Sequence, residues 1–575
     1  MKIAMLSLAL AALAPAASAQ SSLPDSNPQG LHDLFGLVLT AASQPAIGNE
    51  PFSATAAGAT LLADLNPGPA HAFEDGDPEV GLPTPLRGAI MGADLYFFAY
   101  LANGNIGLSR TDGSPVGTAI LHEFPQYGSG TIKYGYPFEG VGLTDRVVFA
   151  ALQPTGAWGL YGTDGTGAAP QLLATTQFRG LDFTRLGNAA LFFDLGTNMQ
   201  VKRTDGTPAG TGVVYTFPPG SSLDYDSFAV VGDEVFFAAN NGTEGMELWR
   251  TDGTPAGTNL VLDISTGTAD SDPADLVAVG EELYFSADDG AGRALWRSDG
   301  TAAGTSLVAK IQWGYSEGPR HLTALGERLF FAHGVSGSKD RLFVFDPASA
   351  SLDMLHEFKG PSGHLEGIRE ITAIGSRRVF VQGNEGFMGF ELWVSDGTVA
   401  GTQLFEDVQP GSGWGLPKEF LLSNGMLFFT AIAVPGVEAL HHRAIGATAH
   451  SLGVGCSASG HLPKLAADDP VLGGTSQIRV RGAEASASVF VFAGPKAAPT
   501  DLGFGCIAHL DLTSMSLVAT GTTDASGAWS SAPISVSSDP ALDGAQLMLQ
   551  AVVGPTGTQP QGFDVSSAVL LTFGN

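Results

Sequence analysis

The sequence predicts an all-β protein, and two observations predict it. The chain has 575 residues, of which 77 are Gly and 34 are Pro, while only 15% are charged, a composition that suits many turns between short strands. Short runs rich in Val, Phe, Tyr and Leu, such as residues 234–240 and 282–288, recur between Gly, Asp and Glu-Glu turns, which is a strand pattern. We therefore expect short strands joined by tight turns over most of the chain.

The first twenty residues carry the pattern of an export signal. Lys2 precedes an apolar run over residues 3–13, and Ala17-Ser18-Ala19 forms a small-residue cleavage site before Gln20. We expect residues 1–19 to be a signal peptide and the mature protein to be secreted or held at the cell surface. No later apolar run approaches the roughly 20 residues of a membrane span, so no span is expected. Residues 20–58, rich in Ala, Ser, Pro and Gly, are expected to form a linker or leader.

A repeat of 41 to 52 residues organises the centre of the chain. It is marked by a turn aspartate at Asp112, Asp164, Asp205, Asp252, Asp299, Asp346 and Asp396. An eighth unit is recognisable at residues 438–446, where Arg443 replaces the aspartate. Each unit contains four short β-rich runs, which is the content of one propeller blade. The second run is apolar on both faces, so we expect it to lie buried between neighbouring blades.

The way the ring closes is predicted from the count of strands. A lone four-stranded sheet leaves both faces wet and two edges unpaired, so such units stack radially and close into a ring. There are eight copies of the first three strands but nine candidates for the fourth, because residues 59–65 precede the first complete unit. Either residues 59–65 complete the last blade, or residues 447–453 do so and the N-terminal strand packs outside. The sequence thus predicts an eight-bladed β-propeller over residues 59–453, with seven blades as the alternative.

The most regular part of the repeat is ELWRTDGTPAGT, residues 247–258, which recurs from residues 294 and 391. Asp can bond its own downstream backbone and Gly accepts a positive φ, so Asp-Gly-Thr suits a hairpin turn after the third strand. The Trp position holds Ser, Tyr, Lys, Phe or Leu in other units, a variation that a catalytic residue would not tolerate. We therefore assign structural roles to Trp249, Asp252, Gly253, Trp296, Asp299, Gly300, Trp393, Asp396 and Gly397.

These residues carry a resemblance to a known family. The three segments resemble the ELWxxDGT repeat of secreted bacterial proteins, sometimes called hyalin-like repeats. The resemblance covers roughly residues 59–450 and is specific in the fourth, fifth and seventh units, whereas the sixth unit (FVFDPAS) and the eighth (LHHRAIG) depart from it. It implies a propeller-like extracellular protein and supplies no catalytic residues to carry over.

The repeat stops before residue 454, and the remaining residues 454–575 have alternating β patterns that predict a small β-sandwich. Segments such as GVGCSASGHLPKL and the final AVLLTFG resemble a terminal module found at the ends of large exported bacterial proteins. That similarity implies export, anchoring or accessory packing. Cys456 and Cys506 are the two cysteines of the chain, and in an exported protein we expect them to form a disulfide.

No catalytic constellation stands out in the sequence. GYSEG, residues 314–318, matches Gly-x-Ser-x-Gly but falls between two β units instead of at a strand-to-helix turn, and no zinc motif occurs. Calcium is the one cofactor that the acids suggest, because loop carboxylates gather after the fourth strand. The candidates are Asp263, Asp270, Asp272 and Asp275, although no EF-hand loop is present and solvated turn acids are the favoured interpretation.

A formal net charge of −30 argues against nucleic acid as a partner. We therefore expect a secreted, monomeric, non-enzymatic repeat protein with a binding, adhesion or envelope-structural role, whose extracellular ligand is a polysaccharide or an envelope component. The alternative is a carbohydrate-active hydrolase or lyase built on the propeller, because fold does not fix function. Carboxylates, Arg and Tyr converging at the channel mouth would favour the enzyme, and small residues there would favour the scaffold.

Overall fold

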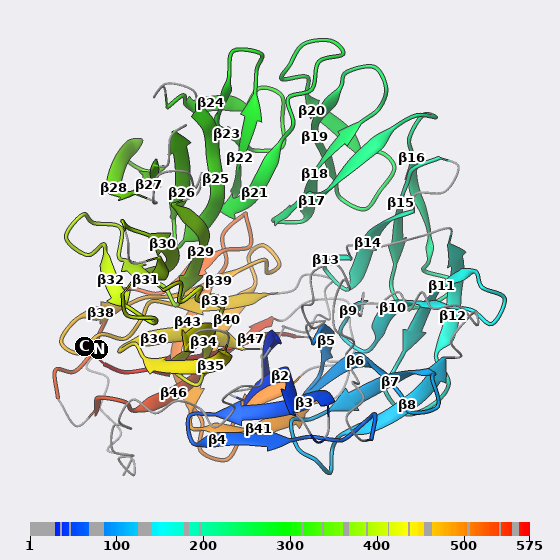
Figure 1. Ribbon diagram of the computed structural model, residues 1–575, viewed down its shortest axis with the longest axis vertical. Coiled ribbons are helices and arrows are strands. Elements are labelled where there is room, and N and C mark those ends of the chain that lie inside the picture. Colours follow the sequence, from blue (N-terminus) through cyan, green and yellow to red (C-terminus); the bar gives the residue numbers. More distant parts are fainter. Residues whose placement is uncertain are drawn as a thin grey trace. The chain divides into compact units, whose positions relative to one another are not determined.

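The structure is a computed structural model, and every element that it describes is a β-strand (Figure 1). It describes residues 29–34, 37–44, 46, 48–67, 86–124, 140–176, 183–194, 198–311, 316–335, 339–359, 367–386, 389–411, 413–434, 437–452, 463–502, 507–539, 542–554 and 563–574. The expected signal peptide (1–19) and the expected disulfide between Cys456 and Cys506 lie outside these residues. The all-β fold class is confirmed.

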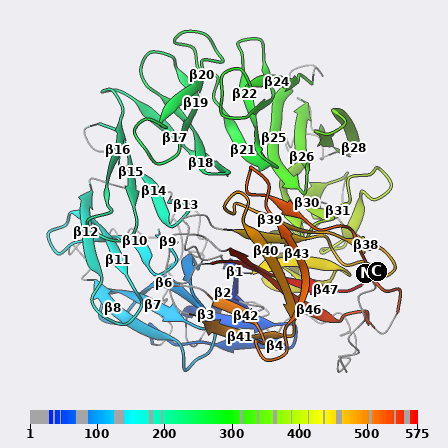
Figure 2. The same cartoon turned by 180° about the vertical axis from the view of Figure 1, so that it is seen from behind.

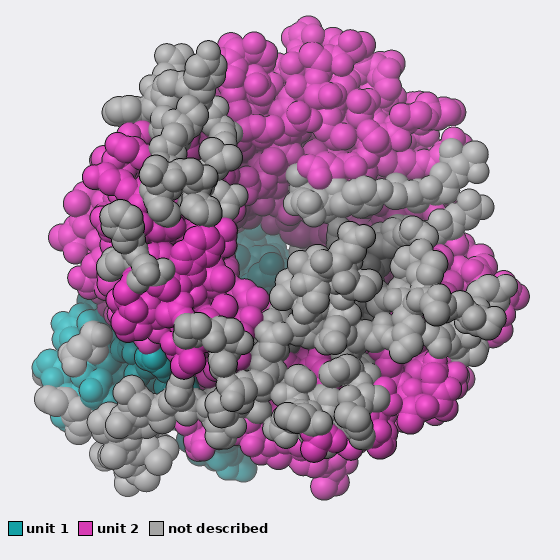
Figure 3. All heavy atoms as spheres, in the orientation of Figure 1, with its two compact units in different colours: residues 1–20, 422–427, 442–575 teal, residues 21–421, 428–441 magenta. Residues whose placement is uncertain are grey.

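The chain divides into two compact units, coloured separately in Figure 3. The larger comprises residues 21–421 and 428–441, and the smaller comprises residues 1–20, 422–427 and 442–575.

Eight four-stranded antiparallel sheets occur among the described residues, each built from four consecutive strands. The first four sheets contain β1 (Gln29–Leu34), β2 (Leu37–Gln44), β3 (Gly48–Thr55) and β4 (Gly58–Leu61); β5 (Gly88–Met91), β6 (Asp94–Tyr100), β7 (Ile106–Thr111) and β8 (Ala119–Phe124); β9 (Gly140–Gly142), β10 (Val147–Leu152), β11 (Trp158–Thr163) and β12 (Gln171–Thr176); and β13 (Thr184–Leu186), β14 (Ala189–Asp194), β15 (Gln200–Thr204) and β16 (Gly212–Thr216).

The next four contain β17 (Ser222–Val231), β18 (Glu234–Asn240), β19 (Met246–Thr251) and β20 (Asn259–Leu262); β21 (Ala274–Val279), β22 (Glu282–Asp288), β23 (Arg293–Ser298) and β24 (Ser306–Ala309); β25 (Ser316–Leu325), β26 (Arg328–Val335), β27 (Lys339–Asp346) and β28 (Ser351–Lys359); and β29 (Ile368–Ile374), β30 (Arg378–Asn384), β31 (Phe390–Ser395) and β32 (Gln403–Glu406). A three-stranded sheet of β33 (Lys418–Ser423), β34 (Met426–Val434) and β35 (Val437–Ala444) follows.

The sheets of the larger unit are arranged radially, with their first strands innermost. β5 contacts β9, β13 contacts β17, and β17, β21, β25 and β29 contact one another in that order, while each fourth strand lies at the outer end of its sheet (Figures 1 and 2). Radial four-stranded antiparallel sheets define a β-propeller. The number of blades in the ring stays a prediction.

The second strand of each sheet forms the core, as its apolar pattern predicts. In β18 the five central residues are buried. Phe236 packs with Leu283 and Trp296 of the following sheet, whereas Phe237 packs with Phe193 of the preceding sheet. Because successive strand residues point to opposite faces, one strand fills both gaps beside its own sheet.

Each outer strand of the sheets from β5–β8 to β29–β32 has a β-bulge at the same place. In β20, Leu262 pairs with Leu248 but Leu260 pairs with Trp249, so Val261 is the extra residue, and its side chain is buried in the core. The same register shift occurs in β8, β12, β16, β24, β28 and β32. A bulge twists an exposed edge and thereby discourages edge-to-edge pairing with another chain.

The N-terminal linker prediction is wrong for those residues of 20–58 that the structure describes. Residues 29–61 form the sheet β1–β4, and the strand at 59–65 pairs with its own β3 through Phe52 and Leu61 instead of completing the last blade. This copy keeps the glutamate of the motif, because the Glu50 carboxylate accepts the backbone N–H of Leu65 at 2.8 Å. It lacks Asp-Gly-Thr and has Phe52 where the three most regular copies have Trp, so a search on the turn motif does not find it.

The alternative closing strand also lies elsewhere. β36 (Thr448–Leu452) pairs with β47 (Asp564–Thr572) in the smaller unit, so the domain border lies before residue 448 and not at 454. The other strands there are β37 (Lys464–Ala467), β38 (Thr475–Ser476), β39 (Ile478–Arg481), β40 (Ser488–Gly494), β41 (Lys496–Asp501), β42 (Ile507–Leu510), β43 (Ser516–Thr522), β44 (Trp529–Ser530), β45 (Ile534–Ser535) and β46 (Gln546–Gly554).

The smaller unit has two main sheets, ordered β36-β47-β46-β40-β43 and β37-β39-β44. Leu465 and Val480 of the smaller sheet share one buried cluster with Val491 and Leu549 of the larger sheet. Two antiparallel sheets that share a core form a β-sandwich, as predicted for this part of the chain.

Candidate functional site

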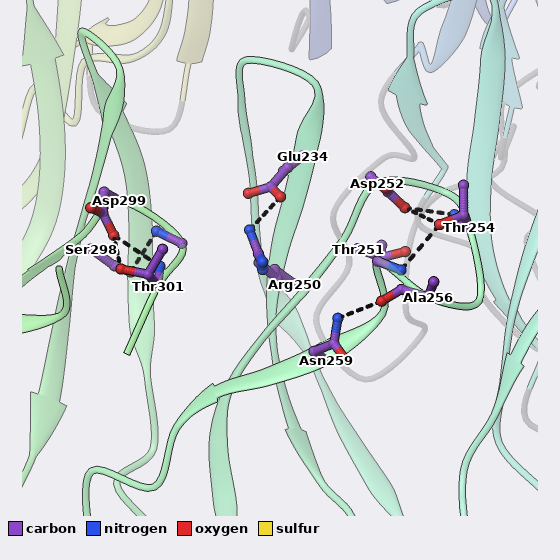
Figure 4. A network of polar contacts seen from close by, with 12 residues as sticks. Glu234, Arg250, Thr251, Asp252, Thr254, Ala256, Asn259, Ser298, Asp299 and Thr301 are labelled. Carbon is purple, nitrogen blue, oxygen red and sulfur yellow. Dashed lines mark hydrogen bonds and ion pairs between the residues drawn. The ribbon is translucent and has the colours of Figure 1, made fainter. Parts of the chain in front are cut away.

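The Asp-Gly-Thr segment forms a closed hydrogen-bonded turn (Figure 4). The Asp252 carboxylate accepts the backbone N–H and the hydroxyl of Thr254 at 2.8 and 2.7 Å, and the Thr254 hydroxyl accepts the N–H of Gly257 at 3.0 Å. Equivalent turns follow Asp205, Asp299 and Asp396. The carboxylate is therefore engaged in holding the turn.

Both glycines of this turn are needed for steric reasons. Gly253 has φ of 80°, a region that side chains with a Cβ avoid. A Cβ on Gly257 would lie 2.0 Å from Asp252 Oδ1, which is far inside contact distance. Gly300 and Gly397 have φ of 87° and 88°, so these two positions need a glycine for the same reason as Gly253.

The tryptophans of the motif lie in the packing between sheets. Trp249, Trp296 and Trp393 are 5%, 8% and 6% exposed. The ring centroids of Trp249 and Phe217 lie 4.9 Å apart. Phe217 precedes β17, the first strand of the sheet that contains Trp249. These side chains leave little surface for a ligand.

The glutamate of ELW is buried and anchors the loop that follows the fourth strand. Glu247 accepts the N–H of Ile264 at 2.9 Å and the Ser271 hydroxyl at 2.6 Å. Glu391 accepts the N–H of Val408 at 2.6 Å and that of Gly415 at 2.9 Å. Burial is the main cause that raises the pKa of both carboxyls, to about 7 for Glu391, against the opposing effect of the N–H donors.

Three segments at the start of inner strands share two positions of positive φ around a proline. These segments, residues 270–275, 316–321 and 414–419, are called the inner-strand loops. Each has a proline preceded by a residue of positive φ, namely Asp272 (45°), Gly318 (82°) and Leu416 (45°). Two residues after each proline stands a second residue of positive φ, namely Asp275 (53°), His321 (54°) and Glu419 (55°). Non-glycine residues in this region cost on the order of 1–3 kcal/mol and concentrate at functional sites.

The residues at the second strained position link neighbouring sheets. Asp275 Oδ1 accepts the backbone N–H of His321 at 2.9 Å. The Glu370 carboxylate of β29 accepts the backbone N–H of Glu419 in the same way, and burial raises the pKa of Glu370 above its usual range. All four side chains are partly exposed. The inner strands thus present ionisable groups at positions where the motif imposes no residue.

The calcium candidates divide among different roles. Asp263 accepts the N–H of Gly267 at 3.0 Å, and Asp270 accepts the N–H of Met246 at 2.7 Å. Asp275 holds the next sheet, as described above. In the described part of the chain no three His, Cys, Asp or Glu residues stand close enough to hold a metal ion.

Asp272 is an exposed carboxyl of the loop at residues 270–275 and is influenced by several charged groups. Partial burial raises its pKa, and Asp270, Asp224 and Asp288 add to this rise while Arg293 opposes it. These groups come from β17, one inner-strand loop, and the end of β22 with the start of β23. Asp272 is therefore within electrostatic range of three other acids and one guanidinium.

Sheet β25–β28, the copy that departs from the motif, contains buried ion pairs. Arg320 Nη2 lies 2.5 Å from Asp340 Oδ2, and the Asp340 side chain is fully buried and also accepts the N–H of Ile368 at 2.8 Å. Arg341 donates to Glu357 Oε2 from Nε at 3.0 Å and from Nη2 at 2.8 Å. Buried charges are costly unless paired, and here each has a partner of opposite charge.

Of the GYSEG segment, the structure describes the backbone of residues 316–318. Ser316 begins strand β25, so the segment leads into a strand and not into a helix, as the elbow of a hydrolase would require.

Sequence reasoning missed residues of the inner-strand loops other than the aspartates, and it missed two residues of the inner strand β29 (Ile368–Ile374). His321, Glu370, Glu419, Arg369 and Trp414 carry no motif of their own. A signal was nonetheless present, because Asp272-Pro273, Gly318-Pro319 and Leu416-Pro417 occupy the same place in three units. Aligning those prolines brings the variable residues into register.

Comparisons with known proteins give no family. No protein-family model matches the chain, and no curated sequence matches it. Among solved structures, BamB from Moraxella catarrhalis is similar with a TM-score of 0.34 and 14% identity, over 62% of this chain and 95% of that chain. An oligogalacturonate lyase in complex with manganese has a TM-score of 0.34 and 14% identity, over 52% and 86%.

A puromycin hydrolase has a TM-score of 0.34 and 14% identity, over 72% of this chain and 61% of that chain. Similarity at this level carries no information about activity. The part of the chain that the structure describes contains no helix able to cross a membrane.

Proposed function

We propose that this chain is an extracellular binding protein that acts without catalysis, and that its ligand lies on the inner-strand loops. The observation that carries the proposal is that repeated and variable residues have different structural roles. The repeated Asp252 and Trp249 are engaged in a turn and in the core, whereas equivalent loop positions hold Asp275, His321 or Glu419. Variable side chains on a rigid, repeated scaffold are the usual basis of recognition.

The extracellular part of the proposal rests on the export signal predicted from the sequence of residues 1–19. The ligand class rests on the charge and hydrogen-bonding groups of the chain. A chain with a net charge of −30 repels polyanions, most strongly at low salt. A polysaccharide or another envelope component presents hydroxyl groups, which the mixed acids, Arg and His of the loops can bond as acceptors and donors.

The test is binding of the purified mature protein to a panel of soluble polysaccharides, measured by affinity electrophoresis and calorimetry. The proposal expects retention by at least one of them, with no new reducing ends or unsaturated products after prolonged incubation. Absence of binding across the panel would refute it.

The second candidate is a carbohydrate-active hydrolase or lyase, and one observation favours it. Asp272 has a raised pKa and lies near three further carboxyls and Arg293, and carboxyls with shifted pKa values are the groups that general acid–base catalysis uses. Product formation that Asp272→Asn abolishes, while Asp289→Asn in the neighbouring loop leaves it unchanged, would establish the enzyme and overturn the first proposal.

A further inference from the structure

We propose that Arg369 and Trp414 form a binding platform for a neutral sugar ring of a polysaccharide. This inference rests on the proposed binding function and adds the place and the ligand class. Arg369 lies at the start of the inner strand β29, and Trp414 lies in the inner-strand loop that follows the same sheet. Arg369 is exposed and Trp414 is half-buried, so both present surface to a ligand.

The guanidinium of Arg369 is held in place by aromatic rings. Its Cζ lies 4.1 Å from the ring centroid of Phe390 and 5.8 Å from that of Trp414. The Phe390 and Trp414 rings meet edge to face at 5.8 Å, and Phe390 is only 1% exposed. A buried ring that stacks on a guanidinium fixes the plane of its N–H donors. The donors are thereby oriented before a ligand arrives.

A β-bulge and a pinned loop determine where the two side chains stand. Ile368 and Glu370 pair with adjacent residues of β30, so Arg369 is the extra residue of a bulge, a feature that re-aims a side chain. On the loop side, the Gly415 N–H donates to Glu391 at 2.9 Å, and the Leu416 N–H donates to the Phe390 carbonyl at 3.0 Å.

Two further contacts fix the loop that carries Trp414. The Pro417 carbonyl accepts Gln382 Nε2 at 2.8 Å, and a Cβ on Gly389 would lie 2.7 Å from Trp414 Cδ1. The indole therefore sits directly against a glycine backbone that no other residue could supply. Little conformational entropy remains to be lost on binding, and such preorganisation favours affinity.

The chemistry of the platform suits a neutral sugar better than an acidic one. A pyranose offers an apolar C–H face to an indole ring and hydroxyl acceptors to a guanidinium. An acidic sugar would also attract Arg369, but Glu370 follows it in β29 and accepts the N–H of Glu419, which adds a second carboxyl nearby. The chain also carries a net charge of −30. The equivalent loop of the sheet β17–β20 has Asp270 where this loop has Trp414, so the two loops do not share the platform.

The test measures the dissociation constants of glucose-, xylose- and mannose-based neutral hexaoses by calorimetry on the full mature chain. Trp414→Ala and Arg369→Ala should each weaken binding of the preferred hexaose by about tenfold or more, the level expected for a central aromatic or arginine contact. Trp414→Phe, which keeps an aromatic face, should lose less than Trp414→Ala. Leu307→Ala on the outer strand β24, where Leu307 is 44% exposed, is the matched control and should leave binding unchanged.

Each outcome decides between the two claims. Binding of neutral hexaoses that Trp414→Ala leaves unchanged overturns the platform while the proposed binding function stands. Binding confined to uronic-acid oligosaccharides, with affinity that falls steeply between about 0.05 and 0.5 M salt, overturns the neutral class. Absence of binding to either kind of oligosaccharide overturns both the platform and the proposed function.

Discussion

Replacing Gly257 by Ala is the sharpest perturbation of the repeated turn. The new Cβ would lie 2.0 Å from Asp252 Oδ1, so the carboxylate must move. Moving it breaks the bonds to the N–H and hydroxyl of Thr254. Each exposed bond of this kind contributes about 0.5–1.5 kcal/mol net.

The loss of both bonds comes to about 1–3 kcal/mol, and the reduced freedom of the unfolded chain offsets about 0.4–1 kcal/mol of it. We therefore expect Gly257→Ala to lower the free energy of unfolding by about 1–2 kcal/mol. Urea titration followed by tryptophan fluorescence measures it. Gly212→Ala at the start of β16 is the matched control, because a Cβ there meets nothing within 4 Å, and it should be neutral or slightly stabilising.

A double-mutant cycle isolates the clash from other effects. With Asp252→Ala already in place, the carboxylate is gone, and the further change Gly257→Ala should cost at least about 1 kcal/mol less than it does alone. Equal costs in the two backgrounds, or equal effects of Gly257→Ala and Gly212→Ala, would refute the proposed role of the carboxylate.

Three further predictions concern buried groups. Trp393→Ala should destabilise the protein by about 3–5 kcal/mol, whereas Trp414→Ala should cost under about 1 kcal/mol, both measured by urea unfolding. Asp340→Ala removes the carboxylate that pairs with Arg320 and should lower the free energy of unfolding by about 3–5 kcal/mol. Glu282→Ala removes the partner of the exposed Arg297 and should lower it by under about 1 kcal/mol. Because the folded pKa of Glu391 is raised from 4.5 to about 7, the folded chain holds a proton that the unfolded chain has lost, so stability should fall as pH rises through that window. Glu391→Gln should flatten this part of the stability profile.

Each of these predictions has a contrary result. Similar losses for the two tryptophan variants would mean that Trp414 is a core residue. A small loss for Asp340→Ala would mean that its ion pair contributes nothing to the sheet. A stability profile for Glu391→Gln that keeps the slope of the parent chain between pH 4.5 and about 7 would assign that slope to other groups.

The repeat could be predicted because its turn chemistry is local. Asp252, Gly253 and Gly257 interact within six residues of chain, and strands that follow such turns must pair with their neighbours. The first sheet escaped detection for the same reason. Its turn differs in sequence, and what it shares with the other copies is the buried Glu50, whose partner Leu65 lies fifteen residues away.

The partner of a strand could not be predicted where no turn dictates it. Thr448–Leu452 has the pattern of a fourth strand, but alternation of apolar and polar residues says only that a face is buried, not which sheet buries it. It pairs instead with β47, more than a hundred residues later. Long-range pairing of this kind depends on packing that no local pattern encodes.

Of the residues in the candidate site, only the aspartates could be singled out from the sequence. Asp270, Asp272 and Asp275 attracted attention as oxygen ligands, and the structure places them in a strained loop where each has a different neighbour. Arg369 and Trp414 are ordinary residues in the sequence, and their relation arises from a bulge and from a loop of the same sheet. A juxtaposition produced by tertiary structure leaves no signature in one sequence.

Hydrogen–deuterium exchange of the mature protein, with and without the hexaose that binds it, tests the central claim most directly. The account predicts slower exchange on binding in peptides covering residues 367–371 and 413–419, with no change in the turns at residues 251–258 and 395–402. Protection of those turns, with unchanged exchange at residues 367–371 and 413–419, would contradict it.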